Sequence, residues 1–135
     1  MATQTKQPGS QVPKFIVVYL RIIAGITFGL GLSLIFWPSQ MVELFFSSGM
    51  SDSEFFVRML GSTLVGYASL NALASYRPVR HSVDVAIWAN LITLLLASLI
   101  SITYVDLFDN LAWLMISQHL VFAAGFFVCV YKLKK

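Results

Sequence analysis

The side chains that could do chemistry in this sequence are polar groups embedded in long apolar runs. Arg21, Arg58 and His119 are ionisable, and Gln118 adds an amide next to the histidine. An ionisable group inside a membrane-spanning helix is costly, so each one is a candidate functional residue. A guanidinium can bind an anionic headgroup or substrate, whereas an imidazole can ligate a pigment, relay a proton or form a packing hydrogen bond. All of these uses remain open from the sequence.

The helical rise of about 1.5 Å per residue divides the embedded polar residues into two layers of different depth. Both arginines also have a purely structural interpretation, because long basic side chains extend toward the nearest polar surface. Arg21 can reach the lipid headgroups, and Arg58 can reach Glu54, one helical turn earlier, or Glu43. The inner layer holds Arg21, Asn71 and Asn90, and the outer layer holds Arg58, Gln118 and His119.

The histidines limit which cofactors the chain could hold. A bis-histidine haem needs two histidines at one depth, but His81 is expected in a loop about a membrane's thickness away from His119. We therefore predict no cofactor and no metal site, and a pigment ligated by His119 alone stays an open alternative. The sequence also lacks HExxH, CxxC and glycine-rich phosphate-binding motifs. These absences favour a protein that is not an enzyme.

The composition determines which solvent can surround these residues. The chain has 135 residues, of which 58% are hydrophobic and 11% are charged, and its mean hydropathy is +0.79. Soluble domains have about 25% charged residues, and one of this size could not bury so much apolar surface. The net charge of +3 does not indicate nucleic-acid binding, because the basic residues lie at the ends of apolar runs. We therefore predict a membrane protein with the lipid bilayer as its first partner.

Four apolar runs each have about the 20 residues that a helix needs to cross the hydrocarbon core. Inside lipid each run must be helical, because its backbone groups find no water to bond. We therefore predict an all-α, four-helix transmembrane bundle that follows a flexible polar tail. Pro38 ends the first run, and Met41, Leu44 and Phe45 then share one face of a short interfacial helix. The tail covers 1–14, the transmembrane domain covers 15–135, and the predicted spans are 15–37, 55–76, 85–104 and 111–131.

The distribution of charge predicts how the spans are oriented. Seven lysines and arginines fall on one side of the four spans, and the loops on the other side contain none. Because basic flanks stay in the cytoplasm, both chain ends are predicted to be cytoplasmic. The chain is then a multi-pass protein of the cell's inner, or plasma, membrane. The basic residues on the cytoplasmic side are Lys6, Lys14, Arg77, Arg80, Lys132, Lys134 and Lys135.

Small residues recur at helical spacing in the predicted spans. Helices in lipid associate through such residues, because they allow two backbones to approach closely. Two interpretations remain open: the small residues pack the helices of this chain together, or one stripe docks a membrane-protein partner or a second copy of the chain. The predicted packing residues are Gly25, Gly29, Ser33, Ser62, Gly66, Thr93, Ala97 and Ser101.

Two stretches of the sequence carry a resemblance to known proteins. The first span ends with Ile-Phe-Trp-Pro at 35–38, ahead of the interfacial helix, and the second span opens with Phe-Val-Arg-Met-Leu-Gly at 56–61, followed by Gly66. In these features the chain resembles small bacterial four-helix membrane proteins of the DoxX-like and related families. The resemblance implies the four-helix fold and a bacterial inner membrane, and it implies no activity and no site residues.

Three functions are compatible with these features. The leading hypothesis is a non-enzymatic accessory, assembly or interaction subunit of a larger membrane complex, because the chain is small and has packing residues on its spans. The alternative is a binder of a lipid, a quinone or a pigment in an outer cleft between the second and fourth spans. The third is a channel or transporter formed by oligomerisation. The ligand contacts predicted for the alternative are Arg58, Gln118, His119, Tyr67 and Phe122.

Overall fold

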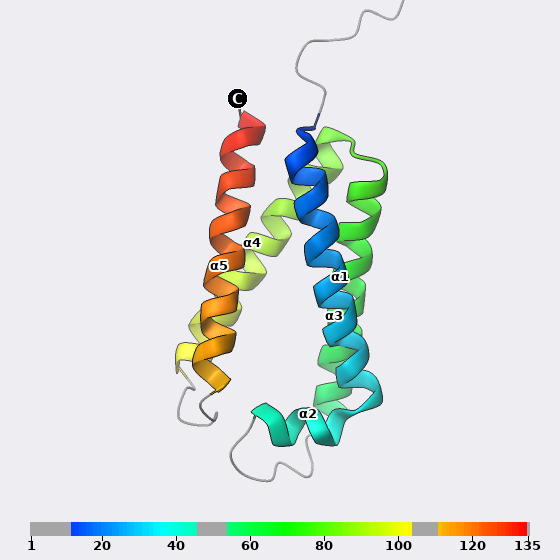
Figure 1. Ribbon diagram of the computed structural model, residues 1–135, viewed down its shortest axis with the longest axis vertical. Coiled ribbons are helices and arrows are strands. Elements are labelled where there is room, and N and C mark those ends of the chain that lie inside the picture. The colour runs from blue at the N-terminus through cyan, green and yellow to red at the C-terminus, as the bar shows by residue number, and fades with distance from the viewer. Residues whose placement is uncertain (1–11, 46–53, 104–110, 135) are drawn as a thin grey trace, which may run out of the picture.

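The structure of the protein is a computed structural model, which describes residues 12–45, 54–103 and 111–134 (Figure 1). Every regular element in these ranges is an α-helix, as predicted. The elements are α1 (Lys14–Phe36), α2 (Pro38–Phe45), α3 (Glu54–Tyr76), α4 (Arg80–Thr103) and α5 (Leu111–Lys134). Among the described residues, α1, α4 and the stretch 116–134 of α5 are long and apolar enough to cross a membrane. This composition is that of a small membrane protein.

The helix boundaries agree with the predicted spans within one residue at the start of α1, α3 and α5. α4 is the exception, because it begins at Arg80 and not at 85. The polar residues at 80–84 do not indicate a membrane span. In the structure, however, Val83 is fully buried and the Arg80 guanidinium donates a hydrogen bond to the Leu133 carbonyl. The first turn of α4 is therefore held against the end of α5. The predicted flexible tail (1–14) lies mostly outside the described residues, which begin at 12.

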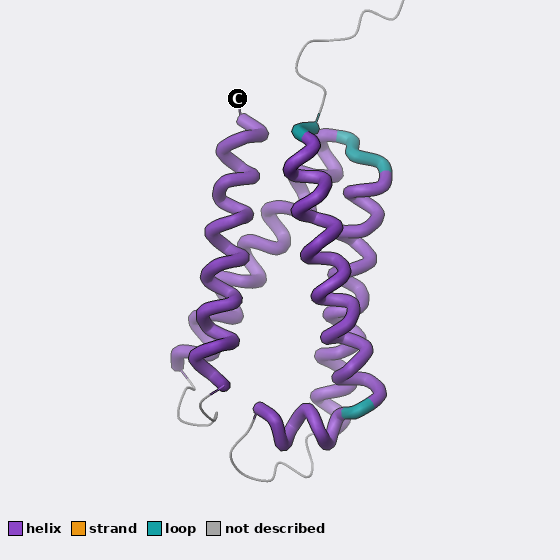
Figure 2. The backbone as a smooth tube through the Cα atoms, viewed as in Figure 1, coloured by secondary structure: helices purple, strands orange, loops and turns teal. Residues whose placement is uncertain are grey.

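The sharp turn between α1 and α2 follows from Pro38. Trp37 still donates its backbone N–H to the Ser33 carbonyl at 2.9 Å, but proline has no N–H with which to continue the helical ladder. Proline is favoured in the first turn of a helix, so Pro38 also begins α2. Figure 2 shows α2 lying across one end of the longer helices. A small apolar cluster joins α1, α2 and α3 at this end, and its buried residues are Leu34, Val42 and Val57.

The closest helix pair is α1 with α3, which run antiparallel and side by side (Figure 1). Gly31 and Gly61 face each other where the two helices approach. A Cβ added to Gly31 would lie 2.9 Å from the Gly61 carbonyl oxygen, and a Cβ added to Gly61 would lie 2.7 Å from the Gly31 carbonyl oxygen. No side chain larger than hydrogen fits at either position unless the helices move apart. These two glycines therefore set the separation of α1 and α3.

The glycines that were predicted to pack the helices lie on other faces. A Cβ added to Gly25, Gly29 or Gly66 would meet no atom within 4 Å, so these positions do not pack one described helix against another. Of the two interpretations, packing within the chain is therefore not found at these three glycines, because regular spacing shows which residues share a face but not which face turns inward. Ser62 is exposed as well, and its hydroxyl donates to the Arg58 carbonyl of its own helix. The other predicted packing residues are partly buried: Ser33, Thr93, Ala97 and Ser101.

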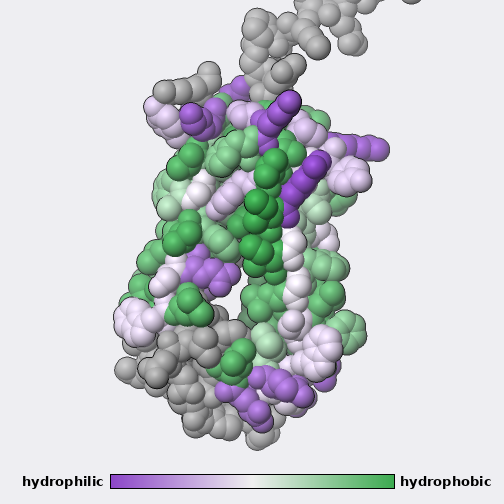
Figure 3. All heavy atoms as spheres, in the orientation of Figure 1, coloured by the Kyte–Doolittle hydropathy of each residue, from purple (hydrophilic) through white to green (hydrophobic). Residues whose placement is uncertain are grey.

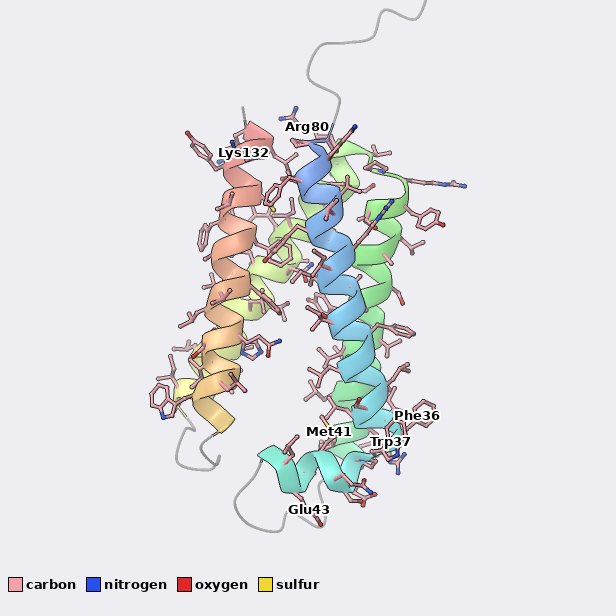
Figure 4. The ribbon with its side chains drawn as sticks, viewed as in Figure 1. Phe36, Trp37, Met41, Glu43, Arg80 and Lys132 are labelled. Atoms are coloured by element: carbon pink, nitrogen blue, oxygen red, sulfur yellow. The ribbon has the colours of Figure 1, made fainter. Side chains whose placement is uncertain are left out.

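The hydrophobic core lies at the end of the molecule where α1 begins and α5 ends, which we call the basic end. Figure 4 shows Arg80 and Lys132 at this end, whereas Glu43 lies at the other end, which we call the α2 end. α1, α3, α4 and α5 all contribute to the core. Toward the α2 end, the α4–α5 pair diverges from the α1–α3 pair (Figure 1). The buried core residues are Ile16, Leu20, Ile23, Ala74, Val83, Ala86, Ile87, Leu91, Ala123, Phe126, Cys129 and Leu133.

Candidate functional site

Two buried asparagines join α3 to α4. Asn71 is 0% exposed and Asn90 is 6% exposed. The Asn71 amide nitrogen donates to the Asn90 oxygen at 3.0 Å, and the Asn90 nitrogen donates to the Asn71 oxygen and to the Ala86 carbonyl, both at 2.7 Å. Each amide thereby replaces the hydrogen bonds that water would otherwise supply. The sequence placed both residues at one depth, and the structure shows that they bond to each other.

Tyrosine hydroxyls make two further contacts between helices. Tyr67 of α3 and Thr93 of α4 share a hydrogen bond of 2.6 Å between their hydroxyl oxygens. Tyr19 of α1 donates to the Phe122 carbonyl of α5 at 2.9 Å, and its ring meets the Phe126 ring edge-on at 5.0 Å between centroids. A Cβ added to Gly125 would collide with the Tyr19 hydroxyl, so this glycine makes the space for the ring. The pairing of Tyr19 with Gly125 could not be predicted from the sequence, because nothing in the spacing of either residue indicates it.

Arg58 is tied to the corner between α1 and α2. Its guanidinium donates to the Ile35 carbonyl at 2.6 Å and lies 3.8 Å from the Glu54 carboxylate, which in turn accepts a hydrogen bond of 2.6 Å from Ser39. The last carbonyls of a helix have no partner within the helix, and a cation near them is favoured by the helix dipole. Arg58 supplies a hydrogen-bond donor and a positive charge to the carbonyl end of α1. Of the two carboxylates that Arg58 was expected to reach, Glu54 is the one that forms an ion pair with it, and the described contacts of Arg58 are structural.

A hollow lies in the half of the molecule next to the α2 end. Figure 3 shows it between α5 and the α1–α3 pair, with a hydrophilic patch on α5 at its edge. The strongly hydrophilic residues in this half of α5 are Gln118 and His119, both of which are half-buried. Nδ1 of His119 is shielded from solvent, and it finds no hydrogen-bond partner among the described residues; Gln118 forms no hydrogen bond with them either. α2 bounds the hollow on one side, because it contacts both α3 and α5.

The five predicted ligand contacts therefore divide into two groups. Arg58 and Tyr67 already have partners in other helices, and the Phe122 side chain packs against the core. Gln118 and His119 form no hydrogen bond with the described residues, and they lie in the half of α5 that borders the hollow. The structure thus brings together only part of the predicted site, and that part belongs to α5 alone.

A second concave surface lies between α1 and α3, on the outside of this helix pair. It is a groove with a volume of about 510 Å³, which we call the Arg21 groove. Arg21 lies at one end of it, with its guanidinium carbon 5.9 Å from the centre of the Tyr76 ring. The residues that line the groove are Arg21, Ala24, Gly25, Phe28, Ala68, Ser69, Ala72, Ser75 and Tyr76.

The described residues hold no cluster of three or more histidine, cysteine, aspartate or glutamate side chains that could bind a metal ion. Cys129 is 0% exposed and belongs to the apolar core. In comparisons with protein-family models, curated proteins and solved structures, none matches this chain.

Proposed function

We propose that this chain is a four-span protein of the inner membrane with both of its ends in the cytoplasm. α3 is less apolar than the other long helices, but the path of the chain supports a fourth span. α1 and α4 both begin at the basic end (Figure 1), so the chain returns from the α2 end between them, and α3 is the described helix that makes this return. Asn71 of α3 is bonded to Asn90, which lowers the cost of placing this helix in lipid.

Within the membrane, the chain binds a lipid-like or quinone-like molecule in the hollow between α5 and the α1–α3 pair. The observation that carries this proposal is a hydrophilic patch on α5 at the edge of the hollow, in the half of the helix that holds Gln118 and His119, where His119 Nδ1 finds no hydrogen-bond partner among the described residues. Polar groups without partners are expensive in lipid, so a bound molecule that bonds to them is favoured. The core closes the hollow at the basic end and α2 closes it at the other end. A flexible apolar molecule can enter from the side, whereas a straight transmembrane helix cannot pass through.

The test is to purify the full-length protein in a mild detergent and to identify the extracted small molecules by mass spectrometry. We expect one enriched apolar species, whose amount falls several-fold in the double variant Gln118→Leu/His119→Leu. Ser117→Ala is the matched control, because Ser117 is exposed and its hydroxyl bonds only to the Trp113 carbonyl of its own helix. Extracts of identical composition from all three proteins would refute ligand binding in the hollow.

An accessory or assembly subunit is the second candidate, and the exposed glycines favour it. Gly29 and Gly66 have open space where a Cβ would lie, so another membrane helix could approach the outside of the α1–α3 pair closely. Neither candidate assigns catalysis to the chain. The same purification tests the second one: a partner protein or a second copy of the chain should be retained by the unmodified protein and lost in Gly29→Leu/Gly66→Leu. A monomer without partners in both samples would count against it.

The resemblance to DoxX-like proteins stays part of this proposal. Two of the residues that carry the resemblance have structural contacts. Arg58 donates a hydrogen bond to the end of α1, and Gly61 packs against Gly31 where α1 and α3 approach. A proline-terminated first span and an arginine near the start of the second would have the same structural use in any chain with this corner. The residues that define the resemblance are therefore explained by the fold and not by a shared ligand.

A further inference from the structure

The Arg21 groove has no role in the function proposed above, and it lies on a different surface. Its α1 residues Arg21, Gly25 and Phe28 are offset around the helix from the core residues Ile16 and Leu20. α1 reaches α5 through Tyr19, on another face of the helix. In a membrane the groove therefore opens toward lipid and not toward the interior of the protein.

The walls of the groove are small and apolar. Ala24, Gly25, Ala68 and Ala72 leave a shallow channel between the two helices, and a Cβ added to Gly25 would meet nothing within 4 Å. An acyl chain fits such a channel. Apolar contact alone selects no molecule in lipid, however, because the surrounding acyl chains offer the same contact. Selection must come from the polar end of the groove.

The polar end of the groove carries an uncompensated positive charge. Arg21 forms no ion pair and no hydrogen bond with the described residues, and its one described contact is with the face of the Tyr76 ring. Helical side chains lean toward the start of their helix, so Arg21 reaches from inside α1 toward the basic end. Tyr76 is the last residue of α3, and a tyrosine at the end of a membrane-spanning helix favours the level of the lipid headgroups. The guanidinium thus lies near the level of the lipid phosphates.

We propose that the Arg21 groove binds one anionic phospholipid from the leaflet at the basic end. The phosphate accepts hydrogen bonds from the Arg21 guanidinium beside Tyr76, and one acyl chain lies along Gly25 and Ala72. A guanidinium binds two phosphate oxygens at once, which an ammonium group cannot do in the same geometry. Lys14, at the start of α1 and at the same end, adds a positive field that favours anionic over zwitterionic lipid.

The experiment reconstitutes the full-length protein in bilayer discs made of equal parts phosphatidylglycerol and phosphatidylcholine, then counts the retained lipids by native mass spectrometry. We expect the unmodified protein to retain phosphatidylglycerol preferentially and Arg21→Gln to lower this preference about tenfold. Gly25→Leu keeps the charge but fills the channel, so it should lower retention as well. Arg77→Gln is the control, because it removes an exposed charge at the same end that does not line the groove.

Three results would overturn the proposal. The first is an unchanged preference in Arg21→Gln, and the second is an equal loss in Arg77→Gln, which would indicate a general basic surface. The third is a dimer that becomes monomeric in Gly25→Leu while lipid retention is unchanged, which would make the groove a contact between two copies. Should a variant fail to fold, a phosphatidylglycerol with a photoreactive acyl chain tests the unmodified protein. It should cross-link to 24–28 or 68–72, and cross-links elsewhere alone would refute the site.

Discussion

Polar side chains in this protein are used mainly to connect helices. In lipid, an amide or hydroxyl without a protein partner finds no water to bond, so a pair of such groups on two helices favours the arrangement in which they meet. Asn71 and Asn90 form such a pair, and Tyr67 with Thr93 forms another between the same two helices. α3 is therefore held to α4 by polar contacts, whereas it is held to α1 by close packing at glycines.

The asparagine pair gives a prediction at the scale of single residues. Asn71→Leu and Asn90→Leu should each lower the free energy of unfolding by about 1 kcal/mol, because each leaves one buried amide without its partner. The double variant removes both amides and should lose less than the sum, with a coupling of about 0.6–1.7 kcal/mol. Circular dichroism during unfolding with a denaturing detergent measures all three.

Ser69→Ala is the control for this cycle, since Ser69 is exposed on α3 and its hydroxyl bonds to the Val65 carbonyl of its own helix. It should leave the unfolding curve almost unchanged. Strictly additive losses from the two asparagine substitutions would show that the amides do not bond to each other in the folded protein.

At the residue scale, the sequence predicted depth better than contact. Counting the helical rise placed Asn71 and Asn90 in one layer, and the acidic residue one turn before Arg58 indicated their ion pair. The bond from Arg58 to the Ile35 carbonyl could not be predicted, because it depends on how α1 lies against α3. The same holds for the burial of His119 Nδ1, which depends on how the residues around α5 pack in three dimensions.

At the scale of the helices, the sequence contained clear signals for boundaries and weak ones for packing. Pro38 ends α1 and begins α2, and both effects follow from proline geometry alone. The packing face of α1 could not be read in the same way. Two series of small residues run along this helix, and only the tertiary structure shows that Gly31 faces Gly61 while Gly25 and Gly29 face outward.

The two series of glycines give a prediction at the scale of the helix pair. Gly31→Ala should lower the free energy of unfolding by about 1–3 kcal/mol, because the new methyl group meets the Gly61 carbonyl and pushes α1 and α3 apart. Gly29→Ala, two residues away on the open face, should be neutral or stabilise the protein by up to about 1 kcal/mol, since alanine is the better helix former. Unfolding in mixed detergent micelles compares the two variants directly.

The opposite order of stability in these two variants would mean that the outward face, and not the Gly31 face, packs the helices. Gly61→Ala provides an independent check from the other helix, because its methyl group would meet the Gly31 carbonyl. It should behave like Gly31→Ala and unlike Gly29→Ala.

At the scale of the whole molecule, the shape connects the charge pattern to the proposed sites. The core packs α1, α3, α4 and α5 together at the basic end, and toward the α2 end the α4–α5 pair diverges from the α1–α3 pair. Composition and hydropathy predicted the helices and the one-sided charge, but they contain no information about where a bundle opens. The hollow is a consequence of how the two helix pairs are inclined, and the Arg21 groove is a consequence of how α1 lies against α3; both become visible only in three dimensions.

The proposed orientation gives the last prediction. Arg80 and Lys132 lie at one end of the molecule and Glu43 at the other (Figure 4), and basic flanking residues are retained in the cytoplasm. Ser82 is exposed near the start of α4, and Gln40 is exposed on α2. Single cysteines at these two positions, each in a Cys129→Ala background, should therefore react with a membrane-impermeant thiol reagent from opposite sides. We expect Gln40→Cys to be labelled in intact cells and Ser82→Cys to be labelled only after the membrane is opened. Labelling of Ser82→Cys from outside would show that the chain has the opposite orientation. The Arg21 groove would then take its lipid from the outer leaflet.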